Sequence, residues 1–225
     1  MKNEMWLIWK HPESRKRYKI GILNYDNNKY TFKYSNPELN SAIEVGFRYF
    51  PGFDNIYKTY ESEELFANIE TRLPNTSRAD YLEILNKYNL EKCSSKMEIL
   101  RATKGRLLTD NYEFVPAFDS SKVEFDVAGT RHCPDVEKCK NLIKFNDNLF
   151  LEMEPNNEFD ENAIKIIFIK NHTKYHLGYV PRYYSEYLTR LLKNNVKYSA
   201  MIQSVNFESE INDEDITAFV KLIFN

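Results

Sequence analysis

The chain has 225 residues, of which 42% are hydrophobic and 28% are charged, a composition typical of a globular protein that buries a core. Its formal net charge of −2 excludes a protein that coats duplex DNA, because such binding needs many Lys and Arg contacts to phosphates. From residue 123 onward there are 12 Lys and Arg against 16 Asp and Glu, so any nucleic-acid binding there must be local.

Aromatic side chains are abundant, with 16 Tyr and 15 Phe. Since Tyr keeps a polar tip, we expect many of these rings at surfaces, where they suit base stacking and protein interfaces alike. The alternative is that they simply fill small cores.

Cysteine usage and hydropathy indicate the compartment. Cys93, Cys133 and Cys139 form an odd, sparse set with no secretory segment before them, which predicts a cytoplasmic protein. No apolar run approaches the length of a membrane helix, so we expect no membrane partner.

The first stretch of the chain has the period of β-strands. Residues 5–34 alternate apolar and polar side chains around the turn signal Asp-Asn-Asn at 26–28, which predicts three strands joined by hairpin turns. A short helix over 38–45 should end at Gly46, and an aromatic loop follows over 47–53.

Residues 61–101 change to a helical period. We expect three short helices: one opened by Ser62 and ended by Pro74, one capped by Ser77, and one over 97–102. This part is therefore expected to be rich in helix.

A boundary is expected at 116–121, where small and polar residues interrupt both periods. Strand patterns then resume in six segments, with one helix over 184–192 before the fifth; the segments are 123–128, 149–153, 163–169, 175–180, 198–206 and 216–223. Short strands interrupted by one helix are typical of a small closed or partly closed barrel.

The most informative segment joins the second and third of these strands and reads Glu-Pro-Asn-Asn-Glu-Phe-Asp-Glu-Asn-Ala-Ile over 154–164. A structural interpretation suffices: Pro-Asn-Asn supplies a turn, and Asp160 caps one helical turn. A functional interpretation adds that Asn157, Phe159 and Asp160 present an amide, a ring and a carboxylate to a base edge, a base face and a sugar hydroxyl. A carboxylate beside nucleic acid suits a place without phosphate, such as a terminal 3′-OH.

This segment resembles the loop of the HIRAN family, and two flanking patterns strengthen the resemblance. Residues 127–132 (Val-Ala-Gly-Thr-Arg-His) are similar to the family's opening strand, and residues 177–182 (Leu-Gly-Tyr-Val-Pro-Arg) to its closing strand. Three patterns in the right order are far more specific than any one. The resemblance covers roughly residues 123–225.

The resemblance implies an OB-like barrel that captures a single-stranded DNA end with a free 3′-OH. Asp160 would accept from that hydroxyl, Phe159 would stack on the last base, and Asn157 would bond its edge. His132 stands where a DNA-capturing member has a stacking tyrosine, and the long segment 133–147 would either extend or obstruct the site. The implied nucleic-acid-binding residues, with both arginines on phosphates, are Arg131, His132, Asn157, Phe159, Asp160, Tyr179 and Arg182.

A weaker resemblance links residues 16–78 to the first subdomain of HipA-type toxin kinases. It is carried by Gly-Ile-Leu at 21–23, Tyr-Thr-Phe-Lys-Tyr at 30–34, Phe-Pro at 50–51, and Leu-Phe and Arg-Leu-Pro within 65–74. It implies a docking module for a partner protein. No Gly-rich phosphate loop or catalytic His-x-Asp follows, so kinase chemistry is not expected.

Metal and catalytic sites are also not expected. The candidate ligands His132, Cys133, Cys139, His172 and His176 lack the paired spacing of a zinc site, and residues 171–175 are interpreted as a strand turn.

The best catalytic case is a metal-dependent nuclease built from Asp160, Glu161 and Lys165. No pattern places a third carboxylate, since the acidic run 208–215 is interpreted as a solvated hairpin loop.

The sequence thus predicts an α+β protein: a mixed module over 1–118, a linker over 119–122, and a HIRAN module over 123–225 built as an OB-like barrel with one main helix. We expect a non-enzymatic, cofactor-free reader of single-stranded DNA ends, with a bacterial, plasmid or phage setting implied by resemblance. One alternative is an adaptor in which the HipA-like half docks a partner protein through the aromatic loop 47–53. The weaker alternative is the nuclease.

Overall fold

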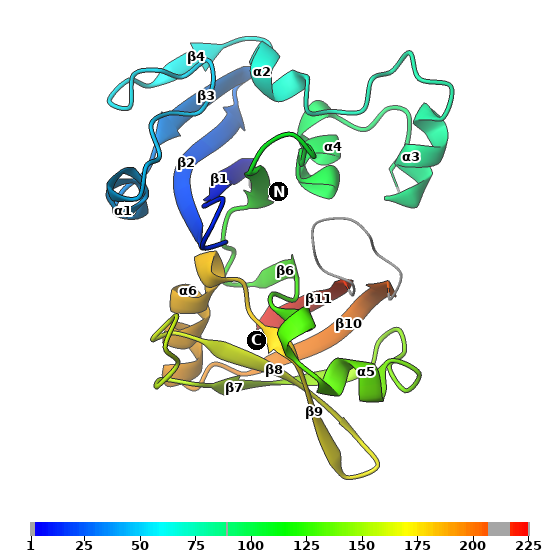
Figure 1. Cartoon of the computed structure of the whole chain (residues 1–225). Coiled ribbons are helices and arrows are strands. Elements are labelled where there is room, and N and C mark those ends of the chain that lie inside the picture. Colours follow the sequence, from blue (N-terminus) through cyan, green and yellow to red (C-terminus); the bar gives the residue numbers. More distant parts are fainter. Residues whose placement is uncertain (1–2, 89, 207–216, 225) are drawn as a thin grey trace. The chain divides into compact units, whose positions relative to one another are not determined.

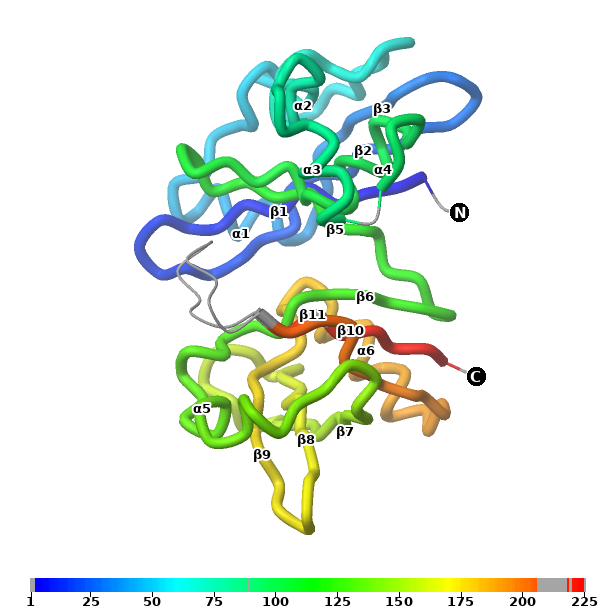
Figure 2. Tube along the Cα trace, turned by 90° about the vertical axis from the view of Figure 1, so that its right-hand side faces the viewer, coloured from blue at the N-terminus to red at the C-terminus, as the bar shows by residue number. Residues whose placement is uncertain are grey.

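The computed structural model describes residues 3–88, 90–206 and 217–224. It divides into two units, Met1–Ala117 and Phe118–Asn225, so the expected linker at 119–122 lies just after the boundary. Each unit is built on one antiparallel sheet (Figure 1, Figure 2). The architecture is therefore mixed α+β, as predicted, with few helices.

The first sheet has the strand order β4-β3-β2-β1-β5. Its strands are β1 (Glu4–Lys10), β2 (Arg17–Asp26), β3 (Lys29–Tyr34), β4 (Tyr60–Ser62) and β5 (Tyr112–Pro116). Asn27 and Asn28 have φ values of 49° and 59°, the left-handed conformation that a two-residue hairpin turn requires and that Asn tolerates. The three predicted strands and their turn are confirmed, whereas β5 was not predicted.

The helices of the first unit are α1 (Glu38–Glu44), α2 (Ala67–Glu70), α3 (Tyr81–Lys87) and α4 (Lys96–Thr103). The predicted helices at α1 and α4 are confirmed, and α4 begins at a capping box formed by Ser95 and Glu98.

The helix predicted between Ser62 and Pro74 is present only as the short α2, and its predicted start at Ser62 is wrong. Residues 60–62 pair with β3 as a short strand, and Ser62 Oγ accepts from the backbone N–H of Glu64 at 3.2 Å, so its hydroxyl closes a turn. The second predicted helix begins after Asp80 and not at Ser77, because residues 75–78 form a turn closed by a bond from Arg78 N to the carbonyl of Asn75.

The core of the first unit is aromatic. Phe32, Phe50, Phe53 and Phe114 are each at most 1% exposed, and the rings of Phe50 and Phe53 stack with centroids 5.6 Å apart. Phe47 is also buried. In the loop 47–53, which one alternative above takes as a docking surface, the three Phe rings therefore fill the core, and Tyr49 has the one exposed aromatic ring.

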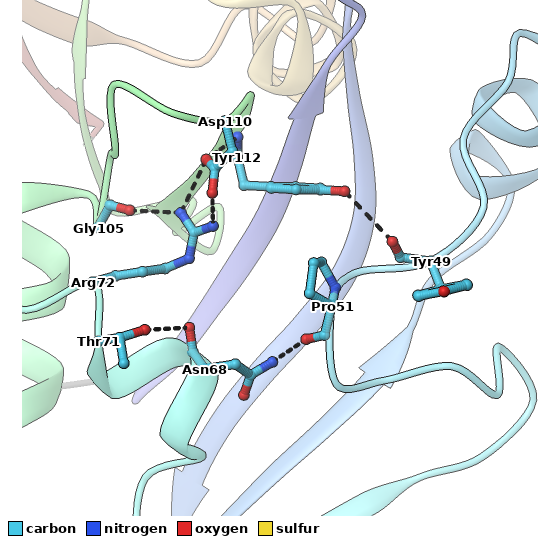
Figure 3. A network of polar contacts seen from close by, with 8 residues as sticks. All are labelled: Tyr49, Pro51, Asn68, Thr71, Arg72, Gly105, Asp110 and Tyr112. Atoms are coloured by element: carbon cyan, nitrogen blue, oxygen red, sulfur yellow. Dashed lines mark hydrogen bonds and ion pairs between the residues drawn. The ribbon is translucent and has the colours of Figure 1, made fainter.

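A buried arginine ties the segment after α4 to this core (Figure 3). The guanidinium of Arg72 pairs with Asp110 and donates from Nη1 to the carbonyl of Gly105 at 2.9 Å. It lies 5.2 Å from the ring centroid of Phe50 and 5.5 Å from that of Tyr112. Arg72 thus joins two parts of the chain through charge, hydrogen bonds and cation–π contacts.

A second buried ion cluster surrounds Glu113 on β5. The Glu113 carboxylate lies 3.1 Å from Arg17 Nε and 2.5 Å from Arg106 Nη2. Burial alone would raise the pKa of Glu113, but the charges of Arg106, Arg17 and Lys104 outweigh it and lower the pKa to about 2.

The second sheet has the order β6-β11-β10-β7-β8-β9. Its strands are β6 (Lys122–Asp126), β7 (Asn148–Met153), β8 (Ile164–Lys170), β9 (Thr173–Tyr179), β10 (Tyr198–Asn206) and β11 (Thr217–Phe224), which confirms all six predicted segments. Asn171 and His172 have φ values of 49° and 63°, so the predicted strand turn between β8 and β9 is also confirmed.

The six strands do not close fully into the OB-like barrel that the resemblance implied. The outer strands of the sheet approach each other where Ala128, just after β6, bridges Tyr179 of β9 through two backbone hydrogen bonds of 2.8 Å. Gly178 has a φ of 141°, and a Cβ there would meet the Ala128 carbonyl oxygen at 2.5 Å. Glycine therefore permits this approach, but β6 ends at Asp126, too early for a full ladder.

Three helical segments complete the second unit: η1 (Thr130–His132), α5 (Asp135–Cys139) and α6 (Arg182–Lys193). The predicted helix is confirmed as α6, which buries Tyr183, Tyr184 and Leu188. The long segment 133–147 contains α5, whose Asp135 accepts from the backbone N–H of His176 on β9 at 3.2 Å.

The acidic run predicted as a hairpin loop, residues 208–215, lies outside the described residues. Within the described ranges, no helix is both long and apolar enough to cross a membrane.

Candidate functional site

The connection between β7 and β8 is a folded loop closed by its own backbone. Glu154 N donates to the carbonyl of Ala163 at 2.8 Å, and Ala163 N donates to that of Asp160 at 2.9 Å. The turn predicted after Asp160 is present as a single hydrogen-bonded turn at 161–162 and not as a helix, and Asp160 Oδ1 caps it by accepting from Asn162 N at 2.9 Å. The loop 154–163 is therefore held at both ends, with its middle free to present side chains.

Asn157 is the internal brace of this loop. Its Oδ1 accepts from the backbone N–H groups of Phe159 at 2.9 Å and Asp160 at 3.1 Å. Its Nδ2 donates to Glu154 Oε2 at 2.7 Å. The amide oxygen is thus fully used, and one N–H of the amide is left for a ligand.

Glu154 is the centre of the hydrogen-bond network below the loop. It accepts from Asn157, from Tyr179 OH at 3.0 Å and from Lys165 Nζ at 2.5 Å. Lys165 lies opposite Tyr179 in the register of β8 and β9, which explains why both reach one carboxylate. The hydrogen bonds from Lys165 and Asn157 lower the pKa of Glu154, while burial and the bond to Glu154 raise the pKa of Tyr179 to about 12.

Phe159 presents the most exposed aromatic ring of the second unit among the described residues, at 81%. Its backbone is nevertheless fixed: Asn157 Oδ1 accepts from its N–H, and Arg182 Nη1 donates to its carbonyl at 2.8 Å. A large apolar ring is held in solvent by two polar contacts, which is unfavourable unless something covers it.

Asp160 anchors the loop to α6. Its Oδ1 accepts from Asn162 N at 2.9 Å, and its Oδ2 accepts from Ser185 Oγ at 2.6 Å. Thr189 Oγ1 donates to the carbonyl of Asn162 at 3.1 Å. A carboxylate accepts about four hydrogen bonds, so Asp160 keeps capacity for a ligand hydroxyl.

The two remaining predicted residues, Arg131 and His132, lie in η1 after Gly129, whose φ of 72° starts that turn. Arg131 Nε donates to His132 Nε2 at 3.0 Å, and both side chains are exposed. A Cβ on Gly129 would lie 3.8 Å from Tyr179 Cδ2, so η1 begins beside the ring of Tyr179.

The structure therefore brings five of the seven predicted site residues into one hydrogen-bond network. Asn157, Phe159 and Asp160 are bonded to one another in the loop, Arg182 donates to Phe159, and Tyr179 is linked to Asn157 through Glu154. Sequence reasoning missed Glu154 and Ser185 as parts of this site. Glu154 lay within the recognised pattern, and only the strand register reveals its pairing with Lys165.

The groups considered for metal binding and catalysis are arranged differently. Within the described residues, no cluster of three His, Cys, Asp or Glu side chains is suited to a metal ion. Lys165 pairs with Glu154 and not with Asp160. Cys133 Sγ lies 3.7 Å from His176 Nδ1, but burial raises the pKa of Cys133 to about 11 and lowers that of His176, so this thiol is held in its unreactive, protonated form.

The comparisons with known proteins agree with the family suggested by the loop. Residues 120–217 match the family model described as the HIRAN domain, so the second unit contains a HIRAN domain. No curated protein matches the chain. The resemblance of residues 16–78 to HipA-type kinases remains a prediction.

Two solved structures are similar to part of the chain. The HIRAN domain of human HLTF is 20% identical, with a TM-score of 0.35, and the match covers 46% of this chain and 74% of that one. A protein from Lactobacillus plantarum is 19% identical, with a TM-score of 0.34, covering 46% of this chain and 97% of that one.

Proposed function

We propose that the second unit binds a single DNA strand at its 3′-OH end and performs no catalysis of its own. The HIRAN domain is associated with DNA binding, and the observation that carries the proposal is the ring of Phe159, 81% exposed on a backbone fixed by Asn157 and Arg182. Stacking of a base on such a ring stabilises binding by about 1–3 kcal/mol and tolerates any sequence.

The acidic loop favours an end over the middle of a strand. Glu154, Glu158, Asp160 and Glu161 all lie within eight residues, so a phosphate placed at the loop would meet several carboxylates. The terminal nucleotide carries a hydroxyl at its 3′ position, and Asp160 has acceptor capacity for it. Arg182 and Arg131 bind the phosphates upstream of the terminal nucleotide.

Asn157 has a smaller direct role in this proposal than the family resemblance implies. Its oxygen already accepts two backbone N–H groups, and its Nδ2 donates to Glu154. One N–H remains for a base edge, so Asn157 acts mainly by holding Phe159 and Asp160 in place.

Fluorescence anisotropy with three labelled ligands tests the proposal: a strand ending in 3′-OH, the same strand ending in 3′-phosphate, and a hairpin with no free single-stranded end. We expect preferential binding of the 3′-OH strand. Equal binding of all three, or no binding at physiological salt, would remove end recognition.

The role of Asp160 is tested with Asp160→Ala, which should abolish the preference for 3′-OH over 3′-phosphate while Phe159 still supports strand binding. Because Asp160 also accepts from Ser185, Ser185→Ala serves as the matched control. It removes the same loop-to-helix bond and keeps the carboxylate. Loss of preference in both variants would mean that loop position, and not the carboxylate, reads the end.

A further inference from the structure

Charge is distributed unevenly along the second unit. Residues 118–161 hold five Lys and Arg against eleven Asp and Glu. Residues 162–206 reverse this balance, with one acid, Glu186, against seven bases: Lys165, Lys170, Lys174, Arg182, Arg190, Lys193 and Lys197. An acidic domain therefore contains a basic segment that begins directly after the loop of the candidate site.

Four of these bases fall on or just beyond α6. Arg182, Glu186, Arg190 and Lys193 are spaced by four, four and three residues, so they share one face of the helix. All four side chains are exposed, as is Lys197 after the helix end, whereas the opposite face is buried. The solvent face of α6 is thus a stripe with a net charge of +2 on the helix itself.

The stripe is largely available to an anion. Arg190 pairs with Glu186 one turn away, an exposed pair that contributes little to stability. Within the described part of the chain, neither Lys193 nor Lys197 takes part in an ion pair. The bases on β8 and β9 differ, because Lys170 pairs with Asp147 and Lys174 with Glu152.

The stripe begins at the candidate site. Arg182, its first member, donates to the carbonyl of Phe159, and Ser185 of the same helix donates to Asp160; Figure 1 shows α6 beside the loop that joins β7 and β8. From Arg182 to Lys193 the helix rises about 16 Å at about 1.5 Å per residue. That length is enough to reach several backbone phosphates of one strand.

We infer that the solvent face of α6 is a phosphate track for the strand whose end lies at Phe159. Arg182, Arg190 and Lys193 contact backbone phosphates at increasing distance upstream of the terminal nucleotide, and Glu186 is the one acidic side chain on this face of the helix. This inference rests on the proposed function and adds a direction and a length to it: the strand runs from the loop along α6, and a strand too short to reach Arg190 gains nothing from the track.

The test compares a strand of about three nucleotides with one of about ten, both ending in 3′-OH, across a series of salt concentrations. The double variant Arg190→Gln/Lys193→Gln should lower the salt slope of log K for the longer strand by about 1.4, which corresponds to two lost phosphate contacts on a single strand. Binding of the shorter strand should not change. Gln keeps the helix propensity of this exposed face.

Two further variants make the result specific. Lys170→Gln/Lys174→Gln removes the same charge from the β8–β9 hairpin and should leave both strands unaffected. Glu186→Gln removes the acid from the stripe and should tighten binding of the longer strand only, an effect that damage to the helix would not produce.

The track is overturned if the α6 double variant weakens both strands equally, if the hairpin variant matches it, or if neither changes the slope. Failure of the proposed function looks different. Wild-type protein that binds no strand removes both ideas, whereas length-dependent binding through α6 without preference for 3′-OH keeps the track and removes end recognition.

Discussion

The two units each contain a network of charged side chains, but the networks are placed differently. In the first unit, Arg72 and Glu113 are each 6% exposed and join segments far apart in the sequence. In the second unit, Glu154 is half-buried and its network ends at Phe159, whose ring is 81% exposed. Buried networks of this kind set stability, because an unpaired buried charge is costly. A network that holds an exposed ring is suited to binding.

The strongest test of this contrast is Arg72→Met. It removes the partner of Asp110 and the donor to Gly105, and we expect a loss of about 3–5 kcal/mol in the free energy of unfolding of the first unit. The two Trp residues, Trp6 and Trp9, both lie on β1, so tryptophan fluorescence during urea unfolding reports on this unit alone.

Arg78→Met is the matched control for Arg72. Arg78 also makes a two-point contact with an aspartate, Asp80, at 2.8 and 2.7 Å, but this pair is exposed to solvent, so its loss should change the free energy of unfolding very little. Equal losses in the two variants would show that burial does not distinguish these networks.

Acid should weaken the first unit through Glu113. The pKa of Glu113 is about 2 in the folded protein, against the ordinary glutamate value of 4.5 that applies in the unfolded chain. The unfolded chain therefore takes up the proton first as pH falls. The stability from this group is complete above about pH 4.5 and is lost towards pH 2, a total of about 3 kcal/mol. Unfolding measured by tryptophan fluorescence across this range should show the loss, and Glu113→Gln should flatten it; an unchanged acid limb in Glu113→Gln would exclude Glu113 as its source.

The sequence predicted the second unit better than the first, for physical reasons visible in particular residues. Alternating strands and the loop 154–164 carry local signals, since Asn at left-handed turns and Gly178 at the bridge are dictated by backbone sterics. By contrast, Ser62 followed by two glutamates has a capping pattern, yet pairing with β3 decides its structure. At Ser62, strand pairing with β3 therefore outweighs the local preference for a helix start.

The sequence predicted the site residues that face solvent and missed the residues that hold them in position. Phe159 and Asp160 belong to the recognised pattern, whereas Ser185 reaches Asp160 from α6, 25 residues away in the chain. The barrel stays open apart from the bridge between Ala128 and Tyr179. The sequence could not predict this, because closure depends on how far β6 extends beside β9, which no residue pattern specifies.

Phe159→Ala should have the opposite profile to Arg72→Met. Its ring is mostly in solvent, so the free energy of unfolding should change little, while single-strand binding should weaken by about 1–3 kcal/mol. Phe159→Trp keeps a stacking ring and should retain binding, with fluorescence quenched as a base stacks on the indole. A loss of affinity in Phe159→Trp equal to that in Phe159→Ala would contradict stacking.

Asn157→Ala gives the smallest and most discriminating effect. The variant keeps the Phe159 ring and the Asp160 carboxylate but removes the acceptor for Phe159 N and Asp160 N. The loop is then less ordered in the free protein and must become ordered when the strand binds. We expect binding to weaken by about 1 kcal/mol, the cost of ordering one or two groups, with faster amide hydrogen exchange at Phe159 and Asp160. Weaker binding without faster exchange would instead indicate that the amide contacts a base directly. The network around Glu154 and Asn157 would then contact the ligand itself. It would differ from the buried network of Arg72 by binding DNA directly, and not by holding Phe159 and Asp160 in position before the strand binds.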